Sequence, residues 1–177
     1  MKILSISHCP LLEYQGTGYI IVNFCRGLRE RGHEVDLFGP DSYEFLKFFR
    51  PRANNYRQAI GMWLFTLNQL SKKDYDIVEF WGGSSWLTSW MLSKLPRRKF
   101  LLVLHTIGPE PKYMETMLKL SRPSEVKMFN RASQRLQIQL AKKSFSSVDS
   151  VVTISQDDRR WLLVNDYIES PKLVSVT

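Results

Sequence analysis

The hydrophobic positions of the chain fall into six short apolar runs that are typical of β-strands. None of them shows the clean alternation of a strand with one solvated face, so we expect strands buried on both faces, as in a parallel sheet. The runs are KILSIS (2–7), HEVDLFG (33–39), DIVEFW (76–81), KFLLVLHT (99–106), SVVTIS (150–155) and KLVSVT (172–177).

Amphipathic segments separate these runs. In residues 18–32, Ile21, Phe24, Cys25 and Leu28 recur at the spacing of one helix face, and Gly32 is a typical helix stop. We expect further helices over 84–95, 124–145, 156–166 and, after a break at Pro51, about 54–70. Their expected apolar sides carry Trp86, Leu87, Trp90 and Met91 in one helix and Val126, Phe129, Leu136 and Leu140 in another.

Strands and helices therefore alternate along nearly the whole chain. This order predicts an α/β fold with a doubly wound, mostly parallel sheet and helices on both of its faces, similar to a Rossmann domain. The 177 residues are enough for one such domain with a sizeable core.

Composition adds a bias in charge. The formal net charge is +8, which favours anionic partners, although a lysine-rich solvated surface gives the same number. The two cysteines, Cys9 and Cys25, form neither a disulfide framework nor a zinc motif. The start lacks a signal-peptide pattern, and the longest apolar run is about half of the roughly 20 residues that span a bilayer. We therefore expect a cytoplasmic protein.

Candidate chemistry lies in the loops at the carboxyl ends of the strands, because ligands of doubly wound sheets bind there. Gly16, Thr17 and Gly18 open the first helix, where backbone N–H groups can meet a phosphate, although ordinary turns need the same residues. Ile21 stands where G-x-G-x-x-G requires its third glycine. This argues against a dinucleotide-cofactor oxidoreductase.

Four polar side chains at this edge are further candidates. His105 ends the most apolar strand, where it can hydrogen-bond to a sugar hydroxyl or be a partly buried structural histidine. His8 follows the first strand, and Glu79 is a carboxylate among apolar neighbours that needs a partner or an open crevice. Ser155 also fits a helix cap with Asp158. The three histidines of the chain show no metal-ligand spacing, so we expect no metal.

The segment 45–63 interleaves basic and aromatic residues. Arg50, Arg52 and Arg57 lie among phenylalanine, tyrosine and tryptophan, a pattern that suits peripheral contact with an anionic membrane or a solvated helix face over an aromatic core. We expect no nucleic-acid partner.

Five stretches, taken in order, resemble one family. GTGYIIVNFCRGLRERGHEVDLF, YDIVEFWGG, LLVLHTIG, SVVTISQDDRRWLL and KLVSVT are similar to successive elements of the retaining, nucleotide-sugar-dependent glycosyltransferases of family four, which have the GT-B fold. The similarity covers nearly all of the chain. It implies that residues 1–177 are the N-terminal, acceptor-side domain, that the C-terminal donor-binding domain is absent from this chain, and that the chain alone is inactive.

The resemblance also implies roles for the candidates. His105 matches the family's histidine near the transferred sugar, and Gly16, Thr17 and Gly18 match the turn that faces the donor diphosphate, with Gln15 in place of a usual glycine. The acceptor pocket would be lined by Glu79, Trp81, His8 and Ser155. The expected partners are a nucleotide-diphosphate sugar as donor substrate, with no cofactor, and a sugar or lipid-linked acceptor. The rival interpretation is a non-enzymatic α/β module that binds a glycan or an anionic lipid headgroup.

Overall fold

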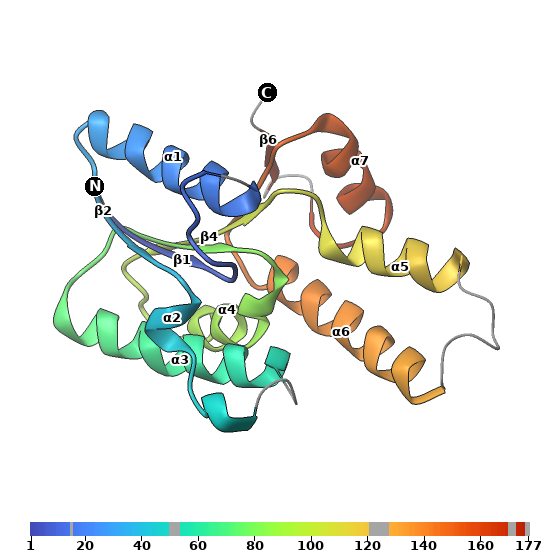
Figure 1. Cartoon of the computed structure of the whole chain (residues 1–177). Coiled ribbons are helices and arrows are strands. Elements are labelled where there is room, and N and C mark those ends of the chain that lie inside the picture. Colours follow the sequence, from blue (N-terminus) through green and yellow to red (C-terminus); the bar gives the residue numbers. More distant parts are fainter. Residues whose placement is uncertain (15, 50–53, 121–127, 170–172, 176–177) are drawn as a thin grey trace.

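The computed structural model describes the chain except for residues 15, 50–53, 121–127, 170–172 and 176–177. Within the described residues, six parallel strands form one sheet in the order β2-β1-β3-β4-β5-β6 (Figure 1). The doubly wound parallel sheet predicted from the apolar runs is confirmed. The strands are β1 (Lys2–Ser7), β2 (Glu34–Phe38), β3 (Ile77–Trp81), β4 (Leu101–Thr106), β5 (Ser150–Thr153) and β6 (Leu173–Ser175).

Helices cover both faces of the sheet. In Figure 1, α1 and α7 lie on one face, and α3, α4 and α6 lie on the other. Short helices α2 (Pro40–Tyr43), η1 (Lys47–Phe49) and η2 (Gly83–Ser85) join the longer ones. The longer helices are α1 (Gly16–Glu30), α3 (Asn54–Lys72), α4 (Trp86–Ser93), α5 (Glu110–Leu120), α6 (Met128–Ser146) and α7 (Gln156–Val164).

The central strands β1, β3 and β4 are buried on both faces, as their unbroken apolar runs predict. Ile3 of β1 packs beneath α1 with Ile21 and Cys25, whereas its neighbour Leu4 packs with Met62 of α3 in the core on the other face. Successive side chains of a strand point to opposite faces, so one apolar run supplies both cores.

Two predicted helix faces are wrong. In α4 the buried residues are Thr88, Ser89 and Leu92, whereas the larger predicted residues are half-buried or, at Met91, exposed. In α6, Leu136 is 47% exposed, while Ile138 and Phe145 face the core. The predicted inward residues Val126 and Phe129 lie where side chains are not described. Small residues point inward on α4 because it packs closely against both α3 and α6.

Helix α5 was not predicted from the sequence. It begins directly after β4 and the turn at Gly108 and Pro109, and the backbone N–H groups of Lys112 and Tyr113 donate to the carbonyl of Pro109. In consequence, a helical first turn stands at the carboxyl edge of the sheet, where the sequence predicts only a loop.

Candidate functional site

The register of the central strands aligns three residues at the carboxyl edge of the sheet. Ser7 of β1 pairs with Trp81 of β3, which pairs with His105 of β4. The order of the strands reverses between β1 and β3, because the chain first adds β2 on one side of β1 and then β3 on the other. This is the switch point at which doubly wound folds bind ligands.

A hollow of about 120 Å³, here called the edge pocket, opens at this place. The loop after β1, the start of α1, the ends of β3 and β4 and the start of α5 all contribute to it. Its polar and aromatic walls come from His8, Thr17, Trp81, His105, Thr106 and Glu110. The predicted site residues His8, Thr17, Trp81 and His105 are thus brought together.

His105 and Glu79 form a buried pair beneath the edge pocket. Nε2 of His105 lies 3.0 Å from Oε2 of Glu79, and the two side chains are only 6% and 5% exposed. Among the described residues, the other carboxylate oxygen of Glu79 has no hydrogen-bond partner. A buried carboxylate is costly without a partner, so His105 satisfies Glu79 while Glu79 fixes the orientation of the imidazole ring.

Aromatic side chains also pack against the imidazole ring of His105. The imidazole of His105 stacks on the indole of Trp81 at 4.1 Å between ring centroids, and Phe24 of α1 meets both rings edge-on. Nε1 of Trp81 donates to Oγ of Ser5 at 3.0 Å. Every torsion of His105 is therefore constrained by packing or by a hydrogen bond, which suits a group that must hold one position.

Cys25 lies just below this cluster and is chemically quiet. Burial raises the pKa of its thiol to about 11, against the smaller effect of the hydrogen bond to Ser5. A thiol with such a pKa is protonated at neutral pH and is a poor nucleophile. Cys25 therefore packs beneath the site as a buried, protonated thiol.

Glu110 is the site residue that sequence reasoning missed. Its Oε2 accepts a hydrogen bond of 2.6 Å from the backbone N–H of Gly83, and its Oε1 lies 3.3 Å from Nε2 of His8. The other ring nitrogen of His8 contacts the carbonyl of Trp81. Glu110 thereby joins α5 to the loops after β1 and β3. The signal was the pair Pro109-Glu110, since proline followed by an acidic residue is typical of a helix start.

In the turn formed by Gly16, Thr17 and Gly18, close packing and backbone conformation account for the two glycines. Gly18 is buried in the first turn of α1, and a Cβ atom there would stand 2.5 Å from both the Pro10 carbonyl and the Leu12 backbone nitrogen. Gly16 has a φ of +63°, which favours glycine. Of the three predicted residues, Thr17 lines the edge pocket, and Gln15 lies outside the described residues.

Ser155 does not line the edge pocket. Its hydroxyl oxygen accepts a hydrogen bond of 3.1 Å from the backbone N–H of Asp158, so it caps the N-terminus of α7 as the capping-box pattern predicts. Asp158 in turn accepts a hydrogen bond from Lys112 of α5. Ser155 is thus engaged in positioning α7.

Arg57 was predicted to lie on a basic outer face, but its side chain is buried. Its side chain is 6% exposed, donates to the backbone carbonyls of Phe45 and Leu46, and pairs with Glu44 at 3.6 Å. The reason is that the segment before α3 leaves carbonyl groups and one buried carboxylate that need a donor. Arg50 and Arg52 lie outside the described residues.

Two further features are excluded for the part of the chain that is described. Its side chains form no group of three or more that could hold a metal ion. None of its helices has the length and apolar character to cross a bilayer.

Comparisons with known proteins bear on the family and the fold. A model of the family described as Glycosyltransferase Family 4 matches residues 14–171. The structure of sucrose-phosphate synthase from Thermosynechococcus elongatus is similar, with a TM-score of 0.70 and 10% identity over 99% of this chain and 48% of that chain. The catalytic domain of starch synthase IV from Arabidopsis thaliana, bound to ADP and acarbose, gives a TM-score of 0.62 and 13% identity over 99% and 51%.

At such low sequence identity, the similarity to these two structures shows the fold alone. The chain spans about half the length of both structures. A comparison with curated protein sequences gives no match.

Proposed function

The chain belongs to Glycosyltransferase Family 4, since the family model matches 14–171 of its 177 residues, and we propose that it is the N-terminal, acceptor-side domain of a retaining enzyme. In this proposal the enzyme moves a sugar from a nucleotide-diphosphate donor to an acceptor that binds in the edge pocket. The donor-binding domain lies outside residues 1–177. The donor is a substrate, and no cofactor is required.

The observation that carries this proposal is the orientation of His105. When Glu79 accepts the Nε2 proton, the imidazole is held rigidly under the edge pocket and its Nδ1 is available to a ligand. The neutral ring can accept a hydrogen bond from a hydroxyl of the transferred sugar, and the protonated ring can donate one. Glu79 is then a positioning residue, because it acts through His105.

The start of α1 supports the donor side of the proposal. Thr17 lies at the positive end of the α1 dipole and lines the edge pocket, where a diphosphate would benefit from free backbone N–H groups. Negative charge that develops on the leaving diphosphate is stabilised there. The positive charge that develops on the sugar lies near the stacked Trp81 and His105 rings.

The test uses the protein that carries the second, donor-binding domain. His105→Ala should lower turnover by about 10² to 10³, which is the usual effect of removing one hydrogen bond that strengthens in the transition state. Glu79→Gln should also lower turnover, and the double variant should lose little more, since the two residues act as one unit. Transfer to the acceptor is measured beside thermal melting of each variant.

Two results would contradict this proposal. A lowered melting point with near-normal turnover in His105→Ala would make His105 structural. Turnover of any nucleotide sugar by the 177-residue chain alone would contradict the missing-domain part, because half a cleft should neither orient both substrates nor exclude water. Glycan binding without transfer by the two-domain protein would favour the rival binding module.

A second proposal concerns peripheral contact with an anionic membrane. Apolar residues on the outer side of α3 and of η1 are exposed: Ile60 at 40%, Leu64 at 54% and Phe48 at 76%. The net charge of +8 favours an acidic surface. With Arg57 turned inward, the exposed apolar residues carry this proposal in place of that arginine.

A further inference from the structure

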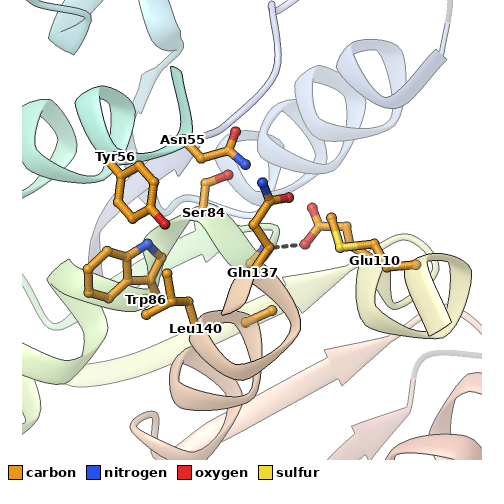
Figure 2. Close-up of a pocket in the computed structure, with 10 residues that line it drawn as sticks. Asn55, Tyr56, Ser84, Trp86, Glu110, Gln137 and Leu140 are labelled. Atoms are coloured by element: carbon orange, nitrogen blue, oxygen red, sulfur yellow. Dashed lines mark hydrogen bonds between the residues drawn. The ribbon is translucent and has the colours of Figure 1, made fainter. Parts of the chain in front are cut away.

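A second pocket lies beside the edge pocket and has no role in the function proposed above. This side pocket has a volume of about 150 Å³ (Figure 2). It lies where the start of α3, η2, α4, α5 and α6 meet. The residues that give it its chemistry are Asn55, Tyr56, Trp86, Glu110, Gln137 and Leu140.

The side pocket is built on rigid elements. Its walls come from helices that pack against one another, α6 against η2, α3 against η2 and α5 against α6. Gly83 forms part of its floor, and a Cβ atom there would stand 2.5 Å from Oε2 of Glu110 and 3.1 Å from Cβ of Ala141. The absence of a side chain at Gly83 therefore allows Glu110 to reach the backbone and shapes the pocket.

Two kinds of surface face each other across the side pocket. Trp86, Tyr56 and Leu140 form an apolar and aromatic side (Figure 2). The side-chain amides of Asn55 and Gln137 also line the pocket (Figure 2), and neither has a hydrogen-bond partner among the described side chains and backbone groups. Glu110 adds a carboxylate.

This combination matches the surface of a pyranose ring. The C–H groups of such a ring present an apolar face that can pack on an indole or a phenol. Its hydroxyls project at the edge, where a side-chain amide can donate and accept and a carboxylate can accept. An acyl chain would cover the two amides without giving them hydrogen-bond partners, which is unfavourable.

The volume of the side pocket favours a single pyranose ring as its occupant. The volume of about 150 Å³ is smaller than the roughly 300–1,000 Å³ of pockets that hold drug-sized ligands. A single pyranose ring with its hydroxyls is therefore a better occupant than an extended lipid chain or a nucleotide.

Glu110 connects the side pocket with the edge pocket, because it lines both. Oε2 bonds to Gly83 at the floor of the side pocket, and Oε1 faces His8 in the edge pocket. A ligand with two linked rings can occupy both pockets while passing one carboxylate.

We propose that the side pocket binds a pyranoside unit of the acceptor, next to the unit whose hydroxyl receives the sugar. The acceptor is then a glycan or glycoside of at least two rings. The role of this pyranoside as part of the acceptor rests on the proposed function, whereas its binding at the side pocket does not.

The test observes tryptophan indole N–H signals of the 177-residue chain by ¹H–¹⁵N NMR, with Trp86→Phe to assign the Trp86 signal. The probes are the methyl glycosides of glucose, galactose and mannose. We expect at least one of them to shift the Trp86 signal with a dissociation constant on the order of millimolar, as is reasonable for one small ring. Gln137→Leu should weaken that binding about tenfold, because the amide loses its hydrogen bonds to the ring.

Leu136→Ala is the matched control, since Leu136 lies on the same helix, is 47% exposed and does not line the side pocket. It should leave the dissociation constant unchanged. No shift of Trp86 with any of the three glycosides, or an equal shift with phenol, would overturn the proposal. This readout involves no turnover, so normal activity of His105→Ala would sink the proposed function and leave the pyranoside site standing.

Discussion

Gly82 shows how one residue sets the geometry between the two pockets. It follows Trp81 with φ 92° and ψ 164°, a conformation that is nearly restricted to glycine. A Cβ atom at this position would also collide with the imidazole of His8 and stand 2.7 Å from Oε1 of Glu110. Both the backbone and the surrounding side chains therefore require glycine here.

We predict that Gly82→Ala lowers the free energy of unfolding by about 3 kcal/mol or more, since strain of roughly 1–3 kcal/mol is added to a steric clash. The matched control is Gly108→Ala. Gly108 has a similar φ of +95°, but an added Cβ would meet nothing within 4 Å. Gly108→Ala should therefore lower the free energy of unfolding by the backbone strain alone. Denaturant unfolding of both variants separates the two effects, and equal losses would show that His8 and Glu110 move aside without cost.

The site residues differ in how far sequence could predict them. His105 and His8 were identifiable because strand ends in a parallel sheet meet at one edge, whatever the helices do, whereas Trp81 was named only through the family resemblance. Glu110 belongs to a helix that the apolar pattern did not reveal. Arg57 looked like a surface cation because sequence does not show that Glu44 and two free carbonyls lie beneath it.

At the scale of elements, strands were predicted better than helix faces. An apolar run must be buried, so β1 and β4 needed no knowledge of their neighbours. The periodicity of a helix places residues on a common side, but packing decides which side faces the core. Ile138 is buried and Leu136 is exposed on α6, although both are apolar and only two positions apart.

The edge strand β2 is tied to the segment before β3 by one carboxylate. Asp36 accepts hydrogen bonds from Nζ of Lys73 at 2.6 Å and from the hydroxyl of Tyr75 at 2.7 Å. Burial alone would raise the pKa of Asp36, but these hydrogen bonds outweigh it and hold the pKa below the ordinary value of 3.8. Burial, followed by the hydrogen bond to Asp36, raises the pKa of Tyr75 to about 12.

The depressed pKa of Asp36 predicts a loss of stability in acid. Above the unfolded-state pKa the carboxylate is ionised in both states and its stabilising effect is complete. As the pH falls below about 4, the unfolded chain binds a proton first, so stability is lost progressively through the lower folded-state pKa. Asp36→Asn should remove this part of the acid dependence while also destabilising the protein near neutral pH.

The measurement is the denaturant midpoint at about pH 7 and about pH 3 for the parent and for Asp36→Asn. Asp74→Asn is the control, because Asp74 is exposed and makes no hydrogen bond to another described residue. An acid dependence in Asp36→Asn as steep as in the parent would show that other carboxylates account for it.

At the scale of the whole molecule, the helices α1 and α3 lie on opposite faces of the sheet (Figure 1). On α3, the apolar residues Ile60 and Leu64 are exposed to solvent. Their spacing of four residues places them on one side of α3. Peripheral binding would therefore turn α3 toward the membrane.

We predict that Ile60→Glu combined with Leu64→Glu lowers sedimentation with vesicles of anionic lipid by about tenfold or more, because binding scales with the apolar area that enters the interface and with attraction to acidic lipids. The charge-matched control is Ile154→Glu combined with Val164→Glu. These residues are 49% and 74% exposed, and Val164 lies on α7, across the sheet from α3. Added salt should weaken binding of the parent, since the net charge of +8 contributes to it.

If both double variants lose binding equally, net charge alone attracts the chain and α3 is not the contact. If the α3 variant sediments as well as the parent, the membrane proposal is wrong, because Arg57 has already been placed in the interior and the exposed side of α3 is what supports it.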